Sequence, residues 1–121
     1  MANKEINEKV KPIILHDHEN EMDYTLEFNR ESVKFAEAHG FNIDDVGRFP
    51  MTRLPDLFYY AFRMHHRNVS RDKTDRILFD VLGGMPDGMA ERLGELYAAP
   101  FEALTSADKD NGKNSRMTVE L

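Results

Sequence analysis

At 121 residues, the chain has the usual size of a single domain with one core of modest extent. Hydrophobic residues make up 40% and charged residues 31%, which is too apolar for a disordered chain, and no apolar run is long enough to span a bilayer. The absence of cysteine excludes disulfides and thiolate chemistry, and together with the lack of a signal peptide it favours the cytoplasm.

The first part of the chain predicts a leader and then a β-hairpin. Residues 1–11 are polar and without periodicity, so we expect a flexible leader before a single globular domain over residues 12–104. Residues 13–15 form a short apolar run. After a polar turn at 16–21, Met22, Tyr24, Leu26 and Phe28 alternate with polar residues. Because an isolated hairpin is marginal in water, its apolar face should pack against helices.

Cap residues predict the first two helical segments. The first helix should run from Asn29, a good N-cap, to Gly40 as its left-handed C-cap, with Phe41 completing a Schellman motif. Asn42 should cap a short turn over residues 43–46. A second helix is expected from Leu54 to about Asn68, with Pro55 in its first turn.

Two more helical segments and a tail complete the expected fold, which is mainly α within the α+β class. Ser70 should cap a helix that Gly83 and Gly84 end, and its apolar stripe comprises Thr74, Ile77, Leu78, Val81 and Leu82. Pro86 should open the last segment, kinked or ended at Pro100. Residues 105–121 read as a flexible, disordered polar tail, whose last five residues either add a strand or hang free. The N-terminal hairpin should therefore pack on a compact bundle of about four to five helices.

No group of residues in the sequence indicates catalysis. His16, Asp17, His18, Glu19 and Glu21 form the only cluster of metal-ligating side chains. A mobile turn supplies few converging ligands, so a solvated turn is the simpler interpretation. His65 and His66 are neighbours that point about 100° apart in a helix and cannot share an ion. Nucleophile and phosphate-binding motifs are absent as well. We therefore expect no enzyme activity, no metal site and no cofactor.

Several short blocks, in order along the chain, carry a resemblance to a known family. They are Tyr24–Arg30, Val33–Glu37, Gly40–Phe41, Pro50–Thr52, Leu57–Phe62 and Thr118–Leu121. In these blocks the chain resembles the tail assembly chaperones of siphophages, the long-tailed phages, of Gram-positive bacteria. The longer leader, residues 1–11, departs from the compact start usual in that family.

The resemblance implies a protein that works by binding other proteins. Such chaperones bind the tape measure protein and recruit subunits of the major tail (tube) protein during tail morphogenesis. They act in the host cytoplasm, are absent from the mature virion, and need no cofactor and no membrane. The resemblance also implies a longer form made by frameshifting, and it leaves self-association open.

The distribution of charge and aromatic residues suggests a binding surface. Residues 48–76 carry a net charge of +4, whereas the remainder carries −10. Aromatic residues and arginine concentrate interface energy, so we expect the outer side of the 54–68 helix to contact the partner. The residues of this predicted surface are Tyr59, Tyr60, Arg63, His66, Arg67 and Phe79. Burial of both tyrosines in the core is the alternative.

A small nucleic-acid-binding regulator is the competing function. The expected 54–68 helix and the helix capped by Ser70 would follow each other across a tight turn, as in a helix-turn-helix motif, and the basic stretch spans both. The overall negative charge speaks against a nucleic-acid partner. Asp72 and Asp75, spaced to pair with Arg76 and Arg71, speak against it too.

Overall fold

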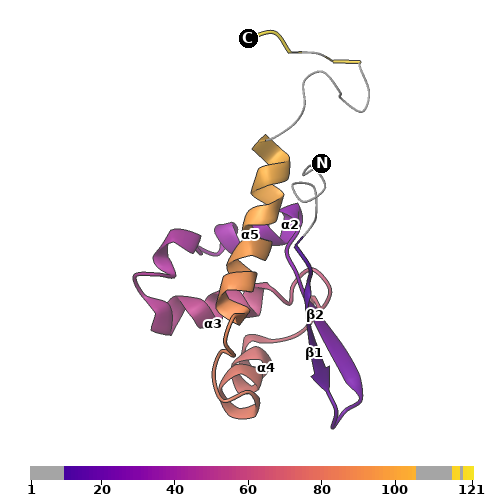
Figure 1. Cartoon of the computed structure of the whole chain (residues 1–121), viewed down its shortest axis with the longest axis vertical. Coiled ribbons are helices and arrows are strands. Elements are labelled where there is room, and N and C mark those ends of the chain that lie inside the picture. The colour runs from indigo at the N-terminus through magenta and orange to yellow at the C-terminus, as the bar shows by residue number, and fades with distance from the viewer. Residues whose placement is uncertain (1–9, 106–115, 118) are drawn as a thin grey trace.

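The chain folds into a β-hairpin followed by four helices (Figure 1). The structure is a computed structural model that describes residues 10–105, 116–117 and 119–121. This fold is mixed α and β but mainly helical, as the sequence predicts. Most of the predicted leader and tail lies outside the described residues. None of the described helices is long and apolar enough to cross a membrane.

The hairpin consists of strands β1 (Ile13–Asp17) and β2 (Met22–Leu26), which pair antiparallel. The predicted turn begins two residues later than expected, because β1 continues until Asp17 pairs with Met22. Tyr24, Leu26 and Phe28 are buried, which confirms the alternating pattern for these three residues, but Met22 at the start of β2 is 43% exposed. The inner face of the hairpin therefore closes one side of the core.

Helix α2 (Arg30–Ala38) has both of its predicted caps. The Asn29 side chain accepts the backbone N–H of Ser32 (2.8 Å), and the Ser32 hydroxyl accepts the backbone N–H of Asn29 (2.9 Å). This reciprocal pair is a capping box. At the other end, Gly40 adopts a φ of 86° and Phe41 donates its backbone N–H to the last turn (3.0 Å). These bonds form the predicted Schellman motif.

A short 3-10 helix, η1 (Ile43–Asp45), leads into α3 (Pro50–Tyr60), whose predicted start at Leu54 is wrong. Proline fits the first helical position because its φ is already helical and its missing N–H is not needed there. Pro50 takes this position, so the helix begins a turn earlier and Pro55 lies in its interior. Pro55 is buried there.

The predicted end of α3 near Asn68 is also wrong. After Tyr60 the chain tightens, and Phe62 donates its backbone N–H to the Tyr59 carbonyl (3.1 Å). Residues 61–70 form turns and irregular backbone instead of two further helical turns. The tightening keeps Phe62 in the core and brings Ala61 beside the hairpin, where its carbonyl accepts the Glu27 N–H (3.0 Å).

The remaining helices follow the predicted order. Helix α4 (Arg71–Arg76) begins after its N-cap Ser70 and continues directly into η2 (Ile77–Val81), a π-helical turn. Gly83 and Gly84 then end this segment with positive φ values of 72° and 122°. Helix α5 (Met89–Thr105) runs through Pro100 without ending there. It crosses in front of α2 and α3 in Figure 1.

The core lies between the hairpin, α2, α3, η2 and α5. Aromatic rings meet edge to face across it, with Phe28 against Tyr97 (5.0 Å between centroids) and Tyr24 against Phe62 (5.5 Å). This arrangement is favoured for ring pairs beyond the burial of their area. Its fully buried large side chains are Leu26, Leu57, Phe58, Phe62, Thr74 and Leu93.

Candidate protein-binding surface

The predicted partner-binding residues lie in three segments of the chain. Tyr59 and Tyr60 lie at the end of α3, whereas Arg63, His66 and Arg67 follow in the irregular segment 61–70. Phe79 lies in the π turn η2. The six residues therefore have to be considered one by one.

Tyr60 belongs to the core, so it cannot contribute to an exposed surface. Its ring packs against Phe41 (5.5 Å between centroids) and Phe35 (6.0 Å). Burial raises the pKa of its phenol, and the nearby Asp56 carboxylate raises it further. Tyr59 is only partly buried, and the Arg71 guanidinium lies 5.8 Å from its ring centroid. The alternative of a core tyrosine thus holds for Tyr60.

Two of the predicted basic residues have structural contacts. Arg63 stacks its guanidinium 3.8 Å from the centroid of the Phe35 ring. His66 accepts the backbone N–H of Thr25 through Nε2 (2.9 Å) and packs against Tyr24 (5.2 Å between centroids). Burial, and secondarily His65, lowers the pKa of His66, which keeps the ring neutral and able to accept. Only Arg67 and Phe79 of the predicted set are exposed.

The π turn presents an exposed apolar surface, of which the sequence predicted Phe79 but not Val81 and Leu82. Leu82 donates its backbone N–H to the Ile77 carbonyl (2.8 Å), five residues earlier, so the turn holds one more residue than an α-helical turn. Leu78 is buried, but Val81 is 73% exposed and Phe79 54% exposed. The expected burial of Val81 and Leu82 in the helix stripe is therefore wrong. We call Phe79, Val81 and Leu82 the π-turn surface.

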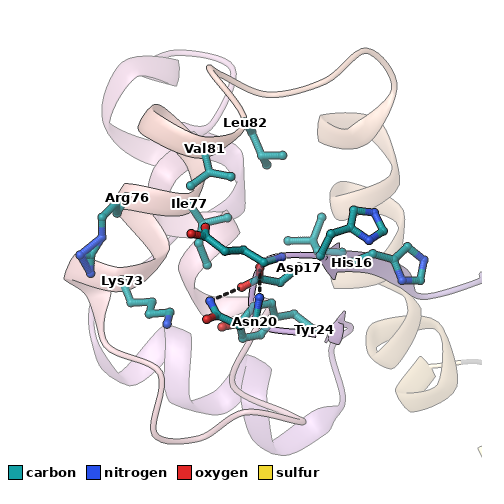
Figure 2. A pocket seen from close by; sticks show the side chains of 12 residues that line it. His16, Asp17, Asn20, Tyr24, Lys73, Arg76, Ile77, Val81 and Leu82 are labelled. Atoms are coloured by element: carbon teal, nitrogen blue, oxygen red, sulfur yellow. Dashed lines mark hydrogen bonds between the residues drawn. The ribbon is translucent and has the colours of Figure 1, made fainter. Parts of the chain in front are cut away.

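A groove runs between this turn and the tip of the hairpin (Figure 2). It has a volume of about 370 Å³, and we call it the β1 groove. Its lining residues are Leu15, His16, Asp17, His18, Glu19, Asn20, Tyr24, Lys73, Arg76, Ile77, Val81 and Leu82. Val81 and Leu82 thus belong to both features, whereas Phe79 does not line the groove.

The hairpin side of the groove is a well-formed turn. Asp17 accepts hydrogen bonds from the side chain of Asn20 (2.9 Å) and from the backbone N–H groups of Glu19 and Asn20 (3.1 Å each). The bonds from Asn20 are the main cause that lowers the pKa of Asp17, and Lys73 across the groove adds to it. Asp17 is therefore an ionised turn-forming group.

A model of the family described as "Domain of unknown function (DUF5055)" matches residues 1–121. The chain belongs to this family. No curated protein and no solved structure matches the chain. Because the DUF5055 description names no activity, the function has to be argued from the residues of the chain itself.

The histidines of the DUF5055 chain have local partners. His16 Nδ1 lies 2.8 Å from Asp23 Oδ1, and His65 Nε2 lies 2.9 Å from Glu27 Oε1. In the part of the chain that the structure describes, no three or more His, Cys, Asp or Glu residues lie together as a group that could hold a metal ion. The cluster at residues 16–21 comprises the end of β1 and the hairpin turn, and His16 and His18 stack their rings there.

The helix-turn-helix geometry expected for a nucleic-acid regulator is not formed. The ten residues 61–70, not a tight turn, separate α3 from α4. Two arginines of the basic stretch are neutralised locally, since Asp56 pairs with both Arg53 and Arg71 (2.9 Å each). Arg71 also pairs with Asp75 (2.9 Å). Of these ion pairs, the one between Arg71 and Asp56 joins α4 to α3.

Proposed function

We propose that this protein is a tail assembly chaperone of long-tailed phages that infect Gram-positive bacteria. In this role it binds the tape measure protein and recruits tail tube subunits while the tail is built. It acts in the host cytoplasm and is absent from the mature virion. The proposal rests on the ordered sequence blocks that resemble this family and on one structural observation.

That observation is the exposure of Phe79 on the π-turn surface. A chain of 121 residues has few aromatic side chains, and most of those in the described part are buried or half-buried. Phe79 is 54% exposed and lies one turn after Arg76. Aromatic side chains and arginine are enriched where interfaces concentrate their energy. Phe79 lies in a π turn, which is itself a feature often found at functional sites.

The chemistry of the partner follows from this surface. A tape measure protein is a long helical chain, and an amphipathic helix offers an apolar stripe with charged flanks. Phe79 and Val81 would contact the apolar stripe, and Arg76 would meet an acidic flank. Shielding that stripe from water is the physical task of a chaperone for a helical partner, because exposed apolar patches cause association.

Co-expression tests the proposal. The tape measure protein of the same phage should be largely insoluble when made alone and soluble when made together with this chain. The two proteins should then elute together, and a tail tube subunit should join them. A tape measure protein whose solubility is unchanged by the chain would overturn the proposal. Tight, salt-sensitive retention on duplex DNA would favour the regulator instead.

A further inference from the structure

Strand β1 has an open edge. On β2, Thr25 donates its backbone N–H away from β1, to His66. Because backbone groups alternate sides along a strand, Tyr24 and Leu26 direct their N–H and C=O groups to β1. The pairing register places Leu15 opposite Tyr24, so Leu15 is hydrogen-bonded to β2. The residues on either side of it, Ile14 and His16, are not. Their N–H and C=O groups point away from β2. Within the described part of the chain, no backbone hydrogen bond reaches them.

The open edge adjoins the β1 groove. Leu15, His16 and Asp17 of β1 form one wall of the groove, and Val81 and Leu82 belong to the other (Figure 2). In a strand added beside β1, every second side chain would point towards the exposed apolar side chains of the groove, Val81 and Leu82. Open backbone groups beside pockets for alternate side chains are the two requirements of β-strand addition.

The chain itself contains a segment that fits these requirements. In residues 117–121, Met117, Val119 and Leu121 alternate with polar residues, which is the pattern of a strand with one apolar face. Met117 is 83% exposed and Val119 59% exposed, so neither packs in the single copy. One copy therefore presents an uncovered apolar segment and an uncovered strand edge.

We propose that residues 117–121 of one copy add as a strand to β1 of a second copy. The side chains of Met117, Val119 and Leu121 would enter the β1 groove. Glu120 would lie on the outer face of the sheet near His16 and His18. The segment of one copy and the groove of the next are different surfaces, so the contact is heterologous and repeats from copy to copy.

We take a second copy as the occupant because the described residues of the segment, 117 and 119–121, remain exposed in the single copy. Helix α5 begins beside β1, where Arg92 donates to the Lys11 carbonyl (3.3 Å). From there the helix carries the chain away for about 20 Å, at about 1.5 Å per residue, before residues 117–121 follow. The contact does not depend on the tape measure protein, so it can be tested with this chain alone.

Two variants remove the two halves of the contact separately. Val119→Asp places a charge on the groove-facing side of the segment. Ile14→Pro removes an outward N–H that β2 does not use, and proline is tolerated on a strand edge. Leu104→Asp is the matched control for Val119→Asp, because it charges an exposed leucine of α5 outside the segment. All three should keep a cooperative thermal melt.

Sedimentation velocity over a range of concentrations tests the contact. The wild-type chain and Leu104→Asp should form larger species as concentration rises, whereas Val119→Asp and Ile14→Pro should each stay monomeric. An equal mixture of these two variants should form dimers and nothing larger, since one supplies the segment and the other the edge. A wild-type chain that is monomeric at every concentration, or Val119→Asp assembling like wild type, would overturn the proposal.

Amide hydrogen exchange identifies the paired strand. Assembly of the wild-type chain should slow exchange at Ile14 and His16 by about tenfold or more relative to Val119→Asp. The protection should appear only at concentrations where the larger species form. Protection of these two amides in the dilute monomer would mean that the segment docks within its own copy, and this would contradict the proposal.

Discussion

The core side of α3 and the π turn η2 carry similar apolar side chains but use them in opposite ways. In α3, Leu57 and Phe58 are completely buried, and their neighbours continue the core. In η2, Leu78 is buried, whereas Phe79 and Val81 are exposed. For Val81 the difference arises because the extra residue of the π turn shifts it off the apolar stripe, whereas Phe79 lies off that stripe in an α-helix as well. Hydrophobicity alone therefore does not decide which aromatic residues are available to a partner.

The largest expected effect separates a core aromatic from an exposed one. Phe28→Ala should lower the free energy of unfolding by about 3–5 kcal/mol, because Phe28 is buried and packs edge to face on Tyr97. Phe79→Ala should lower it by less than about 0.5 kcal/mol, since its side chain is largely in water. Urea unfolding of the two variants checks this, and equal losses would remove the distinction between the two regions.

The next effect concerns the two ion pairs of Asp56, of which the one with Arg71 joins α3 to α4. The Asp56 carboxylate is only 14% exposed and accepts from both Arg53 and Arg71. Asp56→Asn should lower the free energy of unfolding by about 2 kcal/mol, because charged hydrogen bonds are lost in a mostly buried site. Asp75→Asn is the matched control, because Asp75 also pairs with Arg71 but its side chain is 39% exposed, and it should cost less than about 0.5 kcal/mol. Similar costs in thermal melts would show that burial of Asp56 is unimportant.

A smaller effect depends on pH and on the bond between His66 and the hairpin. The folded chain holds the pKa of His66 below its ordinary value of 6.5, so the unfolded chain binds a proton more readily. Above pH 6.5, His66 is neutral in both the folded and the unfolded chain, and its full contribution to stability is present. It is lost as the pH falls through 6.5 towards the lower pKa of the folded state. The loss should approach one hydrogen bond, on the order of 1 kcal/mol.

The variant His66→Gln isolates this contribution. Glutamine can accept the Thr25 N–H but does not titrate, while His65 and Glu27 stay in place. Between pH 8 and pH 5, the wild-type chain should therefore lose more stability than His66→Gln does. Parallel stability curves for the two proteins would mean that His66 does not couple the hairpin to pH.

Much of the fold could be predicted from residues whose effect is local. Asn29 and Ser70 as N-caps, Gly40 with Phe41 as a C-cap, and the glycine pair after η2 all act within a few residues. The alternation that ends at Phe28 likewise identifies a half-buried strand. Such caps and turns depend only on backbone geometry near each residue, so tertiary packing does not alter them and the sequence predicts them correctly.

Of the candidate site, the sequence predicted the exposed Phe79, but the rest could not be predicted because it depends on packing over longer distances. The sequence from Thr74 to Leu82 fits an α-helical stripe, and nothing in it requires a π turn. Tyr60 is removed from the predicted surface because Phe35 and Phe41, from other parts of the chain, cover it. Likewise, the role of His66 as an acceptor exists only once the hairpin lies beside it.

Binding of a tape measure fragment by surface variants tests the central claim most directly. The fragment should be titrated with wild-type chain, with Phe79→Ser, and with Met51→Ser, a control that alters an apolar side chain 88% exposed on α3. All three should melt at nearly the same temperature. We predict that Phe79→Ser weakens binding by tenfold or more, as loss of about 1.4 kcal/mol at an interface anchor would do, while Met51→Ser binds like wild type. Equal affinities of Phe79→Ser and wild type would contradict the assignment of the π-turn surface to partner binding.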